Sequence, residues 1–106
     1  MKELLNSVSN LADQELIQAN KKFPQFNSPH EAYGVLREEI EEHEDDTKAI
    51  MVNLNGLWSA IKHNSTSISG NAIQIKRAAI HAAAEAIQVA AMAQKTLDML
   101  KKEASQ

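Results

Sequence analysis

The chain has 106 residues, a formal net charge of −3 and no cysteine, with one Trp, one Tyr and two Phe. This length suits a single domain with one hydrophobic core. Without cysteine the chain has neither a disulfide scaffold nor a thiolate metal site, which fits a cytoplasmic protein. The 14 acidic residues outnumber the 11 basic ones, so no continuous basic surface is expected for nucleic acid.

The composition favours packed helices over a β-sandwich. Because aromatic residues are few, the core must be built from Leu, Ile, Val, Met and Ala. The longest stretch of low charge, residues 78–93, is interrupted by His81, Glu85 and Gln88. It is therefore too short and too polar to span a membrane, and the amino terminus does not resemble a signal peptide.

Three helices are predicted in chain order. Apolar residues spaced by three and four indicate a helix over residues 3–22. Ser28, Pro29 and Glu31 form a helix start, with Ser28 as N-cap and Glu31 completing a capping box. A second helix is expected over 29–63, either continuous, which we favour, or kinked near Gly56.

An apolar seam is predicted along this second helix, and it should face the core. Its positions are Leu36, Ile40, His43, Thr47, Ile50, Leu54, Leu57 or Trp58, and Ile61. After a loop over 64–71, a third helix is expected over 71–102. Its many alanines predict that it is buried on nearly all sides.

The third helix keeps its polar side chains on one stripe about 80° wide. The stripe consists of Arg77, His81, Glu85, Gln88 and Lys95. Because buried polar groups need partners, the stripe should face the acidic flank of the second helix.

That flank belongs to a dense acidic run. Glu39 and Glu42 are three residues apart and lie beside the seam. Three further acids point to solvent: Glu41, Glu44 and Asp45. Like charges beside a core cost free energy unless a positive group joins them, and a divalent cation would do so. The alternative is that the run is a solvated helix face.

Together the two helices predict an oxygen-rich metal site. Glu39, Glu42 and Glu85, with the Gln88 amide as a fourth oxygen, suit Mg²⁺ or Mn²⁺. Such ions act on polyphosphates, and Arg77 or Lys95 would balance developing negative charge. The chain lacks a Gly-rich phosphate loop, a nucleophile elbow and a zinc-protease motif. It also lacks the Glu-x-x-His pairs of di-iron bundles.

Three segments carry a family resemblance: residues 23–33 (FPQFNSPHEAY), 36–42 (LREEIEE) and 85–93 (EAIQVAAMA). They resemble the small phage and bacterial branch of the MazG-like nucleotide pyrophosphohydrolases, an all-α superfamily that includes the dimeric dUTPases. The resemblance implies magnesium-dependent hydrolysis of nucleoside triphosphates to monophosphate and pyrophosphate, in homodimers or homotetramers. It implies catalytic roles for Glu38, Glu39, Glu42 and Glu85.

The chain departs from the family pattern in two places. Gln88 stands where the family usually has Asp, and a neutral amide is a weaker magnesium ligand. The 42 residues between Glu42 and Glu85 also exceed the usual gap.

We therefore expect one all-α domain over residues 1–106, a bundle of about three long helices whose four-helix core is completed by a second copy. Two alternatives to the enzyme are a non-catalytic binding or regulatory oligomer on the same fold, favoured by Gln88, and a purely structural coiled coil. Neither nucleic acid nor membrane is an expected partner.

Overall fold

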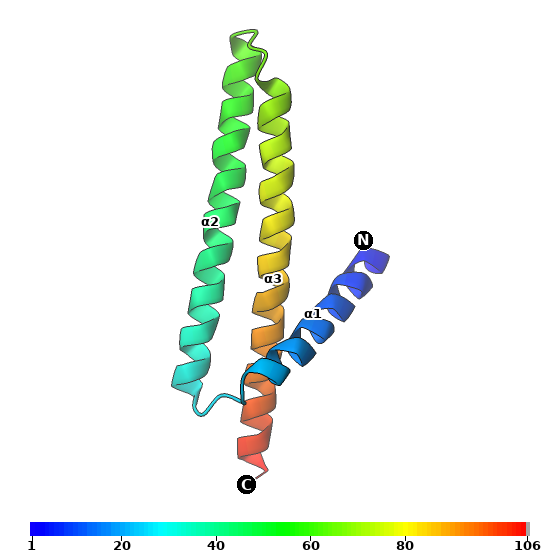
Figure 1. Cartoon of the computed structure of the whole chain (residues 1–106), viewed down its shortest axis with the longest axis vertical. Coiled ribbons are helices and arrows are strands. Elements are labelled where there is room, and N and C mark those ends of the chain that lie inside the picture. The colour runs from blue at the N-terminus through cyan, green and yellow to red at the C-terminus, as the bar shows by residue number, and fades with distance from the viewer. Residues whose placement is uncertain (106) are drawn as a thin grey trace.

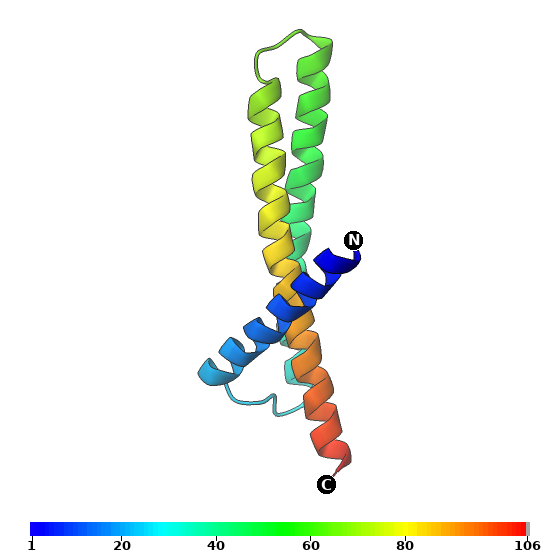
Figure 2. The ribbon, with the colours of Figure 1, turned by 90° about the vertical axis from the view of Figure 1, so that its right-hand side faces the viewer.

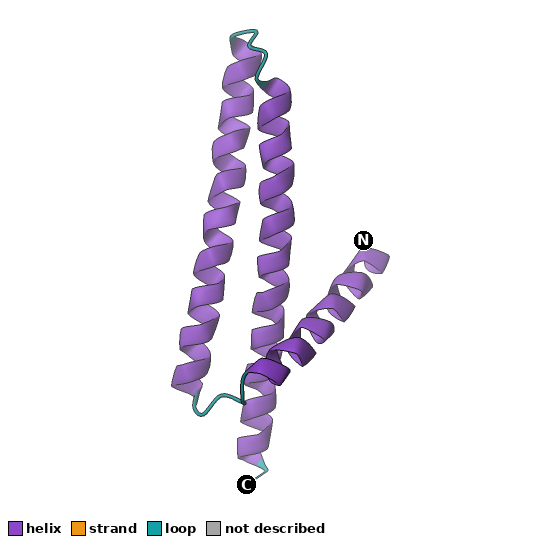
Figure 3. Cartoon of the chain, in the orientation of Figure 1, coloured by secondary structure: helices purple, strands orange, loops and turns teal. Residues whose placement is uncertain are grey.

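The computed structural model describes residues 1–105 and contains three α-helices, with no strand among those residues (Figures 1 and 3). They are α1 (Lys2–Lys22), α2 (Pro29–Lys62) and α3 (Ile68–Ala104). The expected all-α class with three long helices is confirmed. None of the described helices combines the length and apolar character that crossing a membrane requires.

An antiparallel pair of long helices forms the frame of the molecule, which measures 65 × 30 × 22 Å. α2 and α3 lie side by side along most of their length, whereas α1 crosses α3 obliquely and packs only against it within residues 1–105 (Figure 2). Each helix of the pair therefore has a long side that nothing else within residues 1–105 covers.

The start of α2 follows from local chemistry. The Ser28 hydroxyl accepts a hydrogen bond from the Glu31 N–H at 3.2 Å, and Pro29 occupies the first turn. The Glu31 carboxylate accepts hydrogen bonds from the backbone and side chain of Asn27, at 3.2 and 3.1 Å. The reciprocal bond of the predicted capping box thus goes to Asn27 rather than to Ser28.

The turn between α2 and α3 is a Schellman motif. Asn64 adopts a left-handed conformation with φ of 51°, which asparagine tolerates better than most residues. The Ser65 N–H donates to the Ala60 carbonyl at 2.9 Å, and the Asn64 N–H donates to the Ile61 carbonyl at 3.3 Å. These bonds satisfy carbonyls at the end of α2, so the helix runs without interruption to Lys62.

α3 begins at Ile68, three residues before the predicted start at 71. The Asn71 N–H donates to the Ser67 carbonyl at 3.0 Å, and the Asn71 side chain donates to the same oxygen at 3.0 Å. Helical bonding thus reaches back into a segment whose Ser, Gly and Asn content indicated a loop.

The seam between α2 and α3 matches the predicted one in part, because Leu36, His43, Ile50 and Leu57 are partly buried as expected. A further set of buried or partly buried positions recurs every seven residues on α2: Ala32, Glu39, Asp46, Asn53 and Ala60. On α3 the corresponding positions are Asn71, Ala78, Glu85, Met92 and Met99. A seven-residue repeat on both helices is the pattern of a left-handed helix pair.

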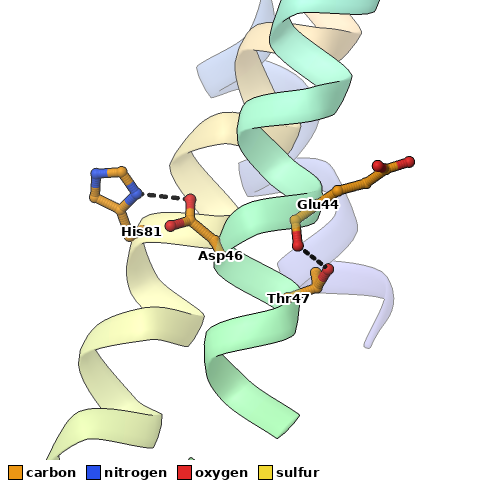
Figure 4. Close-up of polar contacts among 4 residues, drawn as sticks. All are labelled: Glu44, Asp46, Thr47 and His81. Atoms are coloured by element: carbon orange, nitrogen blue, oxygen red, sulfur yellow. Dashed lines mark hydrogen bonds and ion pairs between the residues drawn. The ribbon is translucent and has the colours of Figure 1, made fainter. Parts of the chain in front are cut away.

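The other half of the apolar seam predicted on α2 lies to one side of this contact. Ile40 and Leu54 are 42% and 47% exposed, and Thr47 is exposed as well. The Thr47 hydroxyl donates to the Glu44 carbonyl of its own helix at 2.9 Å instead of entering the core (Figure 4). The expectation that the whole stripe faces the core of the single chain is therefore wrong for Ile40, Thr47, Leu54 and Ile61.

The expected burial of α3 on nearly all sides is also wrong for the single chain. Only four of its residues are buried: Ala82, Ala91, Lys95 and Met99. The reason is that α2 and the oblique α1 can cover only part of its circumference. The main apolar cluster lies at the end of the pair near α1, where Phe26, Ala32 and Met99 pack with Val35 and Met92.

Candidate functional site

Three carboxylates meet near the middle of the helix pair. Glu39 and Glu42 lie one turn apart on α2, and Glu85 faces them from α3. One oxygen from each lies within 4.8 Å of the others. We call Glu39, Glu42 and Glu85 the carboxylate cluster. It arises because the seven-residue repeat places Glu39 and Glu85 in the contact face of their helices.

Two oxygens of the carboxylate cluster are buried without a partner. They are Oε2 of Glu39 and Oε2 of Glu85, neither of which accepts a hydrogen bond within residues 1–105. Buried acceptors in proteins are nearly always paired, so each of these oxygens needs a hydrogen-bond donor or a cation as its partner.

The electrostatics of the cluster disfavour three negative charges. Burial raises the pKa of Glu39, and the charges of Glu42 and Glu85 raise it further. A hydrogen bond to Glu85 raises the pKa of Glu42, with smaller contributions from desolvation and from the charge of Glu85. Each shift has the direction expected when carboxylates share a site without a counter-charge.

A second polar pair joins the helices next to the cluster. Asp46 Oδ2 lies 2.7 Å from His81 Nδ1, and the two side chains point toward each other from α2 and α3 (Figure 4). The Asp46 side chain is 20% exposed and that of His81 is 67% exposed. The hydrogen bond to Asp46, followed by its charge, raises the pKa of His81.

Asp46, His81 and Glu85 form a second group of possible metal ligands, again with ligand atoms within 4.8 Å of one another. Glu85 therefore lies between the carboxylate cluster and the Asp46–His81 pair. The sequence spacing could have predicted this pair. Asp46 lies seven residues after Glu39 and His81 lies one turn before Glu85, so each shares a helix face with a member of the carboxylate cluster.

A pocket of about 390 Å³ opens beside Glu39. α1, the 23–28 connection, α2 and α3 all contribute to its wall. Its apolar lining consists of Ala19, Phe23, Pro24, Phe26, Val35 and Met92. Its polar lining consists of Glu15, Gln18, Lys22, Glu31, Glu39, Gln88 and Lys95. The volume falls within the range of small-molecule sites.

The remaining residues predicted for the site occupy different surroundings. Gln88 is exposed and contributes to the wall of the same pocket as Glu39. Lys95 is buried in the same wall, and its Nζ lies 4.9 Å from the centre of the Phe26 ring. Glu38 and Arg77 are exposed, and neither lines the pocket. Arg77 is eight residues from Glu85 along α3, about 12 Å.

The donor set determines what the site can hold. The carboxylate oxygens of the cluster suit Mg²⁺ or Mn²⁺, which prefer hard oxygen ligands. A cation at the cluster would bind the two unpartnered oxygens and offset the repulsion among the three carboxylates. The residues present therefore fit a divalent metal. No family model, curated protein or solved structure matches this chain.

Proposed function

We propose that the protein is a magnesium-dependent nucleoside triphosphate pyrophosphohydrolase, which converts a nucleoside triphosphate to the monophosphate and pyrophosphate. The activity is the one that the MazG-like resemblance implies. The observation that carries the proposal is the carboxylate cluster, in which two buried oxygens lack any partner within residues 1–105.

Each residue of the site then has a role in binding. Glu39, Glu42 and Glu85 would hold the metal, and Mn²⁺ would replace Mg²⁺ in the same oxygen ligands. When bound, the metal supplies positive charge to phosphate oxygens and lowers the pKa of bound water. Glu38 is exposed one residue before Glu39 and is free to orient a water at the open side. Asp46 holds His81 beside Glu85.

The pocket beside Glu39 supports a nucleotide as the substrate. A polyphosphate bound at the carboxylate cluster would leave the rest of the molecule next to a partly apolar cavity of about 390 Å³. A nucleoside combines an apolar ring face with polar edges, and the lining offers both kinds of side chain.

We further infer that the working form is a homodimer or homotetramer in the reducing cytoplasm. The uncovered faces of α1, α2 and α3 carry many large apolar side chains, among them Leu5, Ile17, Leu54, Trp58 and Ile80. A second copy would cover these faces and complete a four-helix core.

Gln88 favours a second candidate function, a non-catalytic binding or regulatory oligomer on the same fold. Its amide provides one neutral oxygen where the resemblance expects a carboxylate, and this lowers the negative charge available to a metal. In that case the cluster would bind metal weakly and would not support turnover.

The experiment is a pyrophosphate-release assay on ribo- and deoxynucleoside triphosphates with Mg²⁺, Mn²⁺ or EDTA. We expect monophosphate and pyrophosphate as products, with activity lost in EDTA. Glu39→Gln should lower kcat/KM at least about 100-fold, because it removes a metal ligand. Glu44→Gln is the matched control, since Glu44 is an exposed acid on the same helix outside the cluster.

Gln88→Asp separates the two candidates. In the enzyme, the added carboxylate should tighten Mg²⁺ binding, measured by calorimetry, and leave turnover equal or higher. An inactive wild type that gains turnover with Gln88→Asp would establish the non-catalytic module. Turnover that is insensitive to Glu39→Gln would exclude the cluster as the catalytic centre.

A further inference from the structure

Lys95 is a buried basic side chain that makes no hydrogen bond or ion pair within residues 1–105, and its Nζ keeps some contact with solvent. It is 2% exposed and is the largest fully buried side chain of the described chain. Within residues 1–105 it makes no hydrogen bond and no ion pair, although three carboxylates line the same pocket. Its nearest interaction is with the face of the Phe26 ring, 4.9 Å from Nζ.

This arrangement leaves the Lys95 ammonium free to bind a ligand. It has no acceptor within residues 1–105, and a cation–π contact to a phenyl ring offsets only part of the hydration lost on burial. Lysine has three N–H donors and no acceptor. The side chain lines the pocket, so a ligand there that offers an oxygen acceptor would satisfy it.

The position of Lys95 indicates which part of a ligand it meets. Ten residues separate it from Glu85 on α3, about 15 Å along the helix axis. Gln88 and Met92 lie between them in the lining. A nucleotide whose phosphates lie at the carboxylate cluster would extend its sugar and base along this wall toward Lys95.

The chemistry of the wall favours a base rather than another phosphate at Lys95. Glu15, Glu31 and Glu39 line the pocket, and their charges would repel a phosphate bound there without a metal. Phe23, Phe26 and Pro24 offer flat apolar surfaces of the kind that nucleobases stack on.

We propose that this pocket holds the base of the nucleotide and that Lys95 Nζ donates a hydrogen bond to an exocyclic carbonyl oxygen of that base. The inference rests on the proposed function for its substrate class. It makes Lys95 a specificity-determining residue that accepts hypoxanthine, guanine, uracil, thymine and cytosine and rejects adenine, which has no carbonyl oxygen.

The sharpest test compares inosine triphosphate with adenosine triphosphate, since both are purines of equal size that differ at the six position. Wild type should prefer the inosine substrate about 10- to 100-fold in kcat/KM. Adenine has an amino group in place of the carbonyl oxygen, so it would leave the Lys95 N–H donors without an acceptor. Lys95→Met removes the ammonium group and keeps an unbranched, flexible side chain close in length to the lysine stem. It should reduce the preference to less than about threefold.

Lys76→Met is the matched control, because Lys76 is an exposed lysine on the same helix; it should keep the wild-type preference. Magnesium binding by Lys95→Met, measured by calorimetry, should equal that of wild type. The inference would be overturned if wild type had equal kcat/KM values for both purine substrates. It would also be overturned if Lys95→Met lowered kcat/KM for both substrates by the same factor.

A binding arm separates this inference from the proposed function. If no triphosphate is turned over, inosine and adenosine are titrated into the metal-free protein, with the methyl signals of Met92 and Met99 followed by NMR. Preferential binding of inosine that Lys95→Met abolishes would uphold the base pocket without the enzyme. If neither nucleoside binds, the base pocket is overturned.

Discussion

Single titratable residues determine how the stability of this protein should respond to pH. Glu39 and Glu42 have pKa values raised above the ordinary 4.5, and His81 has a pKa raised above 6.5. In each case the folded state holds the proton more tightly than the unfolded state does. The stability from these groups is therefore present at low pH and is lost as pH rises through the raised pKa values.

The metal-free protein should accordingly have a lower Tm at pH 8 than at pH 5.5, measured by circular dichroism in EDTA. His81→Asn should remove the part of this slope that lies above pH 6.5, where the imidazolium loses its proton beside Asp46. A metal-free Tm that rises with pH over this range would contradict the electrostatic account of the site.

A substitution within the carboxylate cluster should stabilise the metal-free protein. Glu39→Gln removes one of three like charges and supplies an amide donor next to Glu85. We expect the free energy of unfolding at pH 7.5 to increase by about 1 kcal/mol, measured by urea denaturation in EDTA. Added Mg²⁺ should raise the Tm of wild type and leave that of Glu39→Gln unchanged. A destabilised Glu39→Gln would mean that the carboxylate has a structural partner.

At the scale of the helices, α2 and α3 approach each other closely at Gly56, near the turn that joins them. A Cβ added to Gly56 would lie 2.9 Å from Oδ1 of Asn71. Asn71 in turn donates through Nδ2 to the Ser67 carbonyl, so its side chain is held in place. Close packing against Asn71 thus explains a glycine at this position, where alanine would otherwise stabilise the helix by about 1 kcal/mol.

A double-mutant cycle tests this contact. Gly56→Ala should stabilise an Asn71→Ala background by about 1 kcal/mol in urea denaturation. In the wild-type background the gain should be less than half of that, because the new methyl group collides with Asn71. Equal gains in the two backgrounds would show that the helices are farther apart at this point.

At the scale of the whole molecule, a second apolar stripe on α2 indicates a second helix-packing surface. Ile40, Leu54 and Ile61 lie at seven- or fourteen-residue intervals and are 42%, 47% and 46% exposed. A stripe with this repeat suits contact with another helix. α1 has no buried residue at all, so one chain leaves much of its apolar surface in water.

Analytical ultracentrifugation should therefore detect a dimer or tetramer of the 11.7 kDa chain at micromolar concentration. Leu54→Glu should shift this species toward monomer, since a charge in an apolar interface is costly. Lys48→Glu, at an exposed polar position of the same helix, is the control. A wild type that sediments only as a monomer would refute the oligomer.

The sequence by itself determined the features that depend on neighbouring residues. The Ser28–Pro29 start of α2, the turn after Lys62 and the all-α class follow from capping, turn chemistry and apolar periodicity, which act within a few residues. The spacing of Glu39, Glu42 and Glu85 also predicted one oxygen-rich cluster, because helical geometry is regular enough to place a face.

Only the tertiary structure decided which face of α2 meets α3. Apolar content placed Ile40 and Leu54 in the seam together with Leu36 and Ile50. The structure leaves Ile40 and Leu54 exposed and partly buries Glu39, Asp46 and Asn53 instead. Two adjacent faces of a long helix differ little in local propensity, so the choice depends on how the partner helix fits. The pocket around Lys95 belongs to the same class of feature. Four separate segments build its wall, and no local pattern brings Phe26 over a lysine that lies 69 residues later in the sequence.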